Sequence, residues 1–127
     1  GRRWPPGGHR VVFHIEPIIS LPRRKPHSYD LVPRLVLEDG EFADRADFMP
    51  RHGGDDVVAR LESDGVYEAI VIARRARTAG TPIGLHVPIS RATLGSSKAV
   101  DMVLAALEAN RAIASAISFV ISQPEPP

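Results

Sequence analysis

The distribution of apolar residues along the chain predicts four strands. Residues 11–21 (VVFHIEPIISL) are rich in β-branched side chains and stop at Pro22, which is typical of a strand. A second apolar run, residues 29–37, ends at the turn signal EDGE around Gly40, although Pro33 inside it favours an edge or a bulge. Residues 82–90 (PIGLHVPIS) and 116–122 (AISFVIS) complete the set. Between the second and third strands, ADRADFMP predicts a short helical turn or loop closed by Pro50.

Residues 55–78 repeat apolar side chains at helical spacing instead. The predicted inward face consists of Val58, Leu61, Val66, Ile70 and Ala73. Asp55 or Asp56 is placed to cap the N-terminus, while arginines in the last turn and Gly80 mark the C-terminus. Gly65 is a candidate break that would divide this helix into two pieces.

Residues 96–110 predict a second helix that begins at a Ser96 or Ser97 cap. Its predicted inward side chains are Val100, Val103, Leu104 and Leu107. The order along the chain is then β-β-α-β-α-β. Strands separated by amphipathic helices favour parallel pairing, so the predicted fold class is α/β.

Composition narrows the classes of function. The 127 residues allow one domain, which we expect at 11–123, with a linker at 1–10 and a tail at 124–127. Sixteen basic and fifteen acidic residues leave a net charge of +1, which gives no reason to expect nucleic acid or an anionic membrane as a partner. The absence of cysteine excludes a disulfide framework, a thiolate zinc site and a Cys nucleophile, and fits a cytoplasmic location. No apolar run approaches the roughly 20 residues of a membrane span, although anchoring of a parent protein stays open.

The stretch RHGGDDVV, residues 51–58, differs little from GGDEF, the signature of enzymes that make cyclic di-GMP. In that signature the phenylalanine starts a strand after a hairpin turn, whereas Val57 stands in its place here and helical periodicity follows. We interpret the stretch as the start of a helix, with His52 and the two aspartates in a solvated position.

Four segments together resemble the EAL domain, the family of cyclic di-GMP phosphodiesterases. HIEPIISLPRRKPHSYDLVPRLVLEDGE is similar to its opening pattern, Q-P-I-V-S-L followed by G-Y-E-A-L-x-R. ADFMP is similar to a phenylalanine-containing segment before the first long helix, and GLHVPIS resembles the strand that carries V-N-(I/L)-S. LEANRAIASAISFVIS resembles the helix and strand that end in F-E-(I/L)-T-E. The turn SLPRRK and the segment ANRAIA look most like divergent alphaproteobacterial EAL proteins of flagellar assembly.

The resemblance implies a TIM-like barrel whose first strand is antiparallel. Such barrels typically need about 250 residues, so the resemblance covers only the N-terminal half, from Phe13 to Gln123. A half barrel leaves open sheet edges, which are prone to pair with another chain. We therefore expect another protein chain, or self-association through these edges, as a partner.

The metal positions implied by the resemblance are degenerate. The glutamate of E-A-L corresponds to Asp30, whose carboxylate is pulled back by roughly 1.5 Å where ligand distances tolerate about 0.2 Å. The other three positions correspond to Pro88, Val120 and Gln123, none of which carries a carboxylate. Divalent cations that activate water need several converging oxygen ligands. The sequence therefore predicts no metal cofactor and no catalytic residue.

Ligand binding without hydrolysis is a separate matter. The resemblance carries over Glu16, Asp30, Val32 and Arg34 as ligand-binding positions, and Arg34 matches the arginine that approaches a phosphate. Glu16 replaces a neutral glutamine, which disfavours a dianionic nucleotide unless Glu16 pairs with Arg34. We expect an inactive module for signalling, protein interaction or cyclic di-GMP reception; the alternative is an active phosphodiesterase fragment with altered metal ligands.

Several of these residues have ordinary structural interpretations. Arg34 could form an ion pair with Glu16 or Asp30 and serve only the fold. His14 and His86 lie in apolar strands without metal-site spacing, and Ser90, Ser96 and Ser97 have no adjacent base in the sequence. The cluster RRARTAG is typical of a solvated helix end, with a basic patch for an acidic partner as the alternative.

Overall fold

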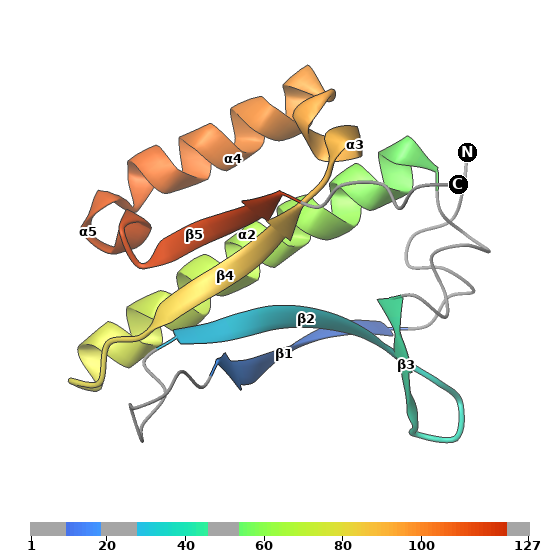
Figure 1. Cartoon of the computed structure of the whole chain (residues 1–127), viewed down its shortest axis with the longest axis horizontal. Coiled ribbons are helices and arrows are strands. Elements are labelled where there is room, and N and C mark those ends of the chain that lie inside the picture. The colour runs from blue at the N-terminus through green and yellow to red at the C-terminus, as the bar shows by residue number, and fades with distance from the viewer. Residues whose placement is uncertain (1–9, 19–27, 46–53, 122–127) are drawn as a thin grey trace.

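The computed structural model describes residues 10–18, 28–45 and 54–121, and its elements form one mixed sheet covered by helices (Figure 1). The strands are β1 (Arg10–Ile18), β2 (Ser28–Val36), β3 (Phe42–Asp44), β4 (Gly84–Ile89) and β5 (Ile117–Ile121). The helices are α2 (Asp55–Thr78), α3 (Arg91–Leu94), α4 (Ser97–Ala109) and α5 (Arg111–Ala114). The predicted α/β class is confirmed.

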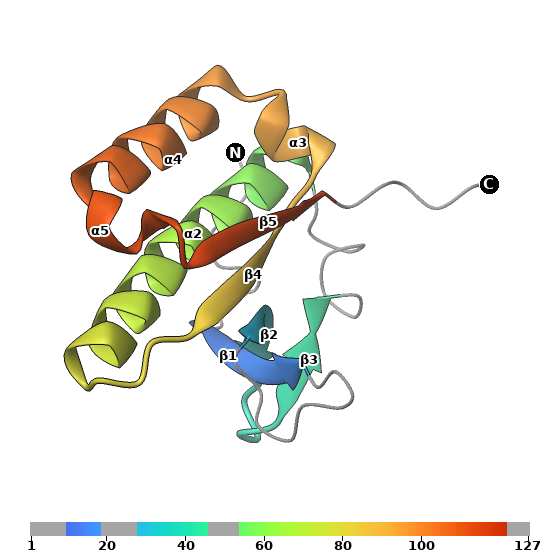
Figure 2. The same ribbon diagram turned by 60° about the vertical axis from the view of Figure 1, so that its left-hand side comes forward.

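The sheet has the strand order β1-β2-β4-β5, with β3 paired to β2 off this path. β1 runs antiparallel to β2 along its full length, whereas β4 is parallel to β2 and β5 is parallel to β4. The first strand is therefore reversed relative to the parallel strands, as the resemblance implies. Figure 2 shows α2 and α4 on the same side of β4 and β5.

The core lies between α2 and the sheet. Strand residues alternate between the two faces, so Leu31, Leu85 and Val87 point to the helix side and are buried. α2 meets them with small and branched side chains: Val66, Ala69, Ile70 and Ala73. The predicted apolar face of this helix is confirmed except that Val58 is only half-buried.

Gly65 does not break α2, which is continuous from Asp55 to Thr78. A Cβ at this position would lie 3.4 Å from both Leu31 Cδ2 and Phe13 Cε1. The glycine therefore marks a place where the helix packs directly against the β1–β2 hairpin. The predicted cap is also corrected: the N-cap is Gly54, and Asp55 and Asp56 lie in the first turn.

β3 replaces part of the helical turn or loop expected from ADRADFMP. The chain turns at Gly40, whose φ of 85° suits glycine, and the amide of Leu37 donates to the carbonyl of Glu41 at 2.8 Å. This turn returns Phe42–Asp44 onto β2, where pairing supplies the order that the local sequence does not specify. Residues 46–53, including Met49, Pro50 and His52, lie outside the described residues.

In α4 the predicted inward face is shifted. Ala99, Val103 and Ala106 are buried, whereas Leu104 is 58% exposed. The first three are spaced by four and three residues and form a narrow stripe, and Leu104 lies one position beyond it. Ser96 provides the N-cap, since its hydroxyl accepts a hydrogen bond from the amide of Ala99 at 3.2 Å.

Candidate functional site

The strand register gathers the sequence-predicted site residues on the sheet face that points away from the helices. We call this face the open face. Glu16, Asp30, His86 and Ser118 occupy successive register positions across four strands. Parallel to this row run the pairs His14 with Val32, Val12 with Arg34, and Pro88 with Val120. Residues far apart in the sequence thus share one surface because paired residues project to the same side.

Arg34 is the best-anchored charge on the open face. Its Nη2 lies 2.7 Å from Glu16 Oε1, and its Nε lies 3.0 Å from Asp44 Oδ1. The guanidinium also donates to the carbonyl of Pro33 at 3.3 Å, and its side chain is only 17% exposed. Of the structural alternatives for Arg34, the ion pair with Glu16 is the one present. Asp44 was missed because it lies on β3, which the local sequence does not indicate.

Two carboxylates already neutralise this guanidinium. Glu16 and Asp44 bind the guanidinium through its Nη2 and its Nε, so both of these nitrogens already have a carboxylate partner. A phosphate oxygen that approached Arg34 would have to displace a charge-assisted hydrogen bond and would meet the remaining carboxylate. Arg34 can therefore contact a phosphate only if one of these ion pairs is lost.

The implied metal positions do not fit a divalent-metal centre. Pro88 and Val120 are register partners, and neither side chain has an oxygen or nitrogen that can coordinate. Asp30 is on the same face, while Gln123 lies outside the described residues. Among residues 10–18, 28–45 and 54–121, no three His, Asp or Glu side chains are grouped as a metal site requires.

The histidines and the arginine cluster take ordinary positions. The ring of His14 packs edge-on against Phe42, with centroids 4.8 Å apart and an interplanar angle of 81°. His86 lies between Asp30 and Ser118 in register. At the end of α2, Arg77 donates to the carbonyl of Ala112 at 2.7 Å and thereby ties this helix to α5.

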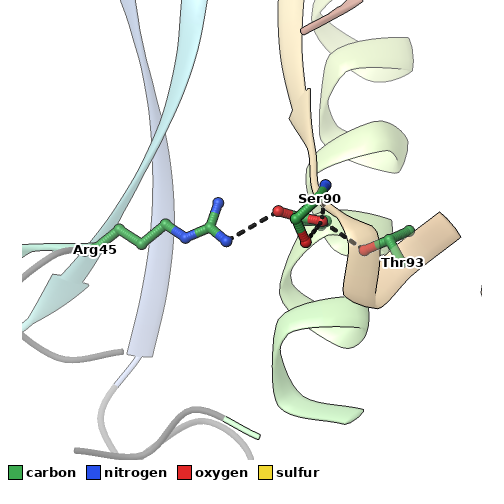
Figure 3. A network of polar contacts seen from close by, with 4 residues as sticks. Arg45, Ser90 and Thr93 are labelled. Atoms are coloured by element: carbon green, nitrogen blue, oxygen red, sulfur yellow. Dashed lines mark hydrogen bonds and ion pairs between the residues drawn. The ribbon is translucent and has the colours of Figure 1, made fainter. Parts of the chain in front are cut away.

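Sequence reasoning missed a buried carboxylate network on the helix side of the sheet (Figure 3). The Glu62 side chain is 1% exposed, and its Oε1 accepts hydrogen bonds from Ser90 N at 2.8 Å, Ser90 Oγ at 2.9 Å and Thr93 Oγ1 at 2.5 Å. Its Oε2 lies 2.9 Å from Nη2 of Arg45, which follows β3. The available signal was a glutamate directly after Leu61 on the apolar face of the helix.

The Glu62 network closes the gap between β2 and β4. These strands pair only at Ser28–Asp30 with Gly84–His86 and then diverge. A cavity of about 10 Å³ remains there, between Arg45, Glu62, Gly65 and Pro88. That volume is at the threshold for a single water molecule, so this gap is a packed joint and not a ligand pocket.

None of the described helices is long and apolar enough to cross a membrane. No family model matches the chain, and no curated protein matches it by sequence.

Comparison with solved structures identifies the fold. The EAL domain of Xanthomonas citri FimX in complex with c-diGMP superposes with a TM-score of 0.74 at 19% identity, covering 89% of this chain and 44% of that chain. An EAL domain protein from Listeria monocytogenes gives 0.65 at 13% identity, covering 90% and 44%. The S helix-GGDEF-EAL region of Vibrio cholerae LapD gives 0.68 at 13% identity, covering 87% and 26%. This chain thus spans less than half the length of each of these structures.

Proposed function

We propose that this chain, whose fold is a partial EAL-type α/β barrel, is a non-hydrolytic protein-interaction module of cyclic di-GMP signalling. The observation that carries the proposal is the combination of this fold with side chains at Pro88 and Val120 that cannot bind metal. Hydrolysis of a phosphodiester by metal-activated water needs converging oxygen ligands, and these two positions supply none.

The ion pairs of Arg34 support a protein-interaction module over a receptor for cyclic di-GMP. The one retained phosphate-binding position is held between Glu16 and Asp44, at 2.7 and 3.0 Å. Binding a dianion there would cost the energy of these ion pairs as well as the repulsion of the carboxylates. Binding of a protein partner does not require Arg34 to give up these ion pairs.

Reception of cyclic di-GMP is the second candidate. Arg34, Val32, Asp30 and Glu16 share one face, and the FimX structure of similar fold is a complex with c-diGMP. In this case ligand would have to displace Glu16 from Arg34. Glu16→Gln would remove that competition and should then tighten binding of cyclic di-GMP.

The experiment is calorimetric titration of the chain with cyclic di-GMP, in the absence and presence of Mg²⁺ or Ca²⁺, with chromatography of the products. We expect no hydrolysis and no binding to the wild-type chain. Binding without hydrolysis that is lost in Arg34→Ala would support the receptor. Linear product that forms in proportion to enzyme would overturn the proposal and favour a phosphodiesterase with altered ligands around Asp30.

The proposal includes a protein partner at an open sheet edge, either another protein or a second copy. It also includes a cytoplasmic location, supported by the lack of cysteine. Participation in flagellar assembly is part of the same proposal and is supported only by the sequence resemblance at SLPRRK and ANRAIA. The near-neutral net charge of +1 argues against nucleic acid as the partner.

A further inference from the structure

A groove lies between α2 and α4, the two longest helices of the layer that covers the sheet (Figure 2). α2 precedes β4 and α4 precedes β5, and these strands are parallel neighbours, so both helices begin at the same end of the molecule. The groove lies at that end and has a volume of about 270 Å³. One wall is α2 from Asp56 to Ser63, and the other is α4 from its cap, Ser96, to Met102. We call it the α2–α4 groove.

The floor of the α2–α4 groove contains a buried hydroxyl group. Ser63 lines the groove and is only 3% exposed. Its hydroxyl has no hydrogen-bond partner in the part of the chain that the structure describes. Ala59 and Ala99, which are both buried, leave room beside it. Because a buried hydroxyl without a partner is unfavourable, a ligand that reaches this floor gains a hydrogen bond that the protein itself does not make.

The mouth of the groove offers one charge of each sign. Arg60 forms an ion pair with Asp64 at 3.3 Å. Asp56 on the α2 wall and Lys98 on the α4 wall are exposed, and neither forms an ion pair with another described residue. A carboxylate only accepts hydrogen bonds, and an ammonium group only donates them. The complementary ligand therefore has an anionic group at the α4 wall and a hydrogen-bond donor at the α2 wall.

The N-terminus of α4 strengthens the attraction for an anion beside Lys98. The first turn of α2 contains two acidic residues, whereas the first turn of α4 contains none. Lys98 lies in that first turn, where a cation opposes the helix dipole unless an anion lies between them. Phosphate groups bind readily at helix N-termini, because the first-turn amides point at the ligand and the dipole favours negative charge.

We propose that the α2–α4 groove binds a small free phosphate monoester whose body carries an amino or hydroxyl group. The phosphate contacts Lys98 and the first turn of α4, and the donor group of the body reaches Asp56. The body packs on Ala59 and Ala99 and forms a hydrogen bond with Ser63. This site lies in the helical layer, on the other side of the sheet from the open face, so the inference does not depend on the proposed function.

The test is titration of the intact chain, followed by amide shifts in NMR, with phosphoethanolamine, ethyl phosphate and inorganic phosphate as probes. We expect saturable shifts at residues that line the α2–α4 groove. Phosphoethanolamine should have a lower Kd than ethyl phosphate, because only the former carries a donor for Asp56. Absence of saturable shifts in the groove, or equal Kd values for these two esters, would overturn the proposal.

Two charge variants test the two walls separately. Lys98→Ala should raise the Kd of all three probes about tenfold, because it removes a charge-assisted hydrogen bond. Asp56→Asn should raise the Kd of phosphoethanolamine but lower that of inorganic phosphate, because it weakens the partner of the amine and removes a repulsive charge. Arg74→Ala, at an exposed arginine of α2 outside the groove, is the matched control and should change neither value. Equal losses in Lys98→Ala and Arg74→Ala, or the same direction for both probes in Asp56→Asn, would contradict the site.

Ser63→Ala tests the floor of the groove. The variant should raise the Kd of phosphoethanolamine without lowering the melting temperature of the free chain, because the hydroxyl has no partner to lose within the described residues. A lower melting temperature with unchanged Kd would show that this hydroxyl serves the fold and not a ligand.

A phosphorylated protein is the competing source of the same phosphate chemistry. A peptide that contains phosphoserine should therefore bind more weakly than phosphoethanolamine, and tighter binding of the peptide would overturn the assignment to a free ligand. Assay of the same chain with cyclic di-GMP keeps this inference apart from the proposed function. Hydrolysis of cyclic di-GMP would overturn the proposed function and leave the groove as it is, whereas failure of all three probes would overturn only the groove.

Discussion

Glu62 is the residue on which most elements converge. Its carboxylate receives hydrogen bonds from the end of β4 and from α3, and an ion pair from the segment after β3. If the Glu62 carboxylate is removed, the buried hydroxyl of Thr93 and the amide of Ser90 lose their hydrogen-bond acceptor. We therefore expect Glu62→Ala to lower the free energy of unfolding by about 2–4 kcal/mol.

Urea denaturation measures this change, with Glu62→Gln as an intermediate variant that keeps an acceptor but loses the charge opposite Arg45. The matched control is Glu108→Ala, because Glu108 forms only an exposed ion pair with Arg111 at 3.3 Å. Equal effects of Glu62→Ala and Glu108→Ala would show that the network contributes little.

At Gly65, unlike Glu62, we expect replacement by alanine to increase stability. Its place inside α2 costs helix stability, and the space around it admits a Cβ at 3.4 Å from Leu31 and Phe13. We expect Gly65→Ala to raise the free energy of unfolding by about 0.5–1 kcal/mol. Gly40→Ala is the contrasting variant, since the φ of 85° there should make alanine destabilising. A loss of stability in Gly65→Ala would mean that the hairpin cannot accept the added methyl group.

At the residue scale, the sequence pointed to Arg34 and Glu16 but not to the other carboxylates, Asp44 and Glu62, that form ion pairs in the structure. Glu16 and Arg34 could be singled out because both occupy positions of the EAL sequence pattern that they resemble. Asp44 and Glu62 were missed because their roles depend on contacts with partners 10 to 31 positions away. Such contacts leave no periodic signal in the chain.

At the scale of elements, the N-terminus of α4 gives a test of which serine caps the helix. Two adjacent serines were equivalent candidates for its cap, and the hydroxyl that accepts from Ala99 belongs to Ser96. Ser96→Ala should therefore lower the free energy of unfolding by about 1 kcal/mol. Ser97→Ala, at an exposed position in the first turn, should have little effect in the same thermal or urea unfolding experiment. Equal losses from both variants would contradict this assignment.

The elements themselves were largely predictable, because hydrophobic periodicity specifies long helices and buried strands. Two errors have physical causes. β3 has only three residues, and its order comes from pairing with β2. In α4 the apolar positions exceed what one face can bury, so the sequence does not decide that Leu104 lies outside the buried stripe.

For the molecule as a whole, the ion pair of Arg45 with Glu62 links the β1–β3 side of the sheet to α2. We expect Arg45→Ala to increase amide hydrogen exchange in β3 and at the adjoining end of β2, while exchange in β4 and β5 changes less. Arg60→Ala, which removes only an exposed ion pair with Asp64, is the control. Exchange that rises equally in every strand would indicate global destabilisation and contradict a local link.

The overall architecture followed from the order of strands and helices together with the reversed first strand. The set of residues that share the open face could not be derived from the sequence, because register between strands is set by pairing and not by any single segment. The exposure of Leu104 was likewise not predictable, because its helical spacing places it among the expected core residues.

The short pairing of β2 with β4 has a mechanical consequence. Three register pairs, one ion pair and the packing of Leu31 and Leu35 against α2 join the β1–β2–β3 meander to the α/β portion. Strand pairing across this boundary, with three register pairs, is shorter than the nine pairs of β1 with β2 and the five pairs of β4 with β5, so the boundary is a seam in the hydrogen bonding of the sheet. Under pulling force or mild denaturant the molecule should part along this seam first, and each unit should keep its own hydrogen bonds after the other has separated.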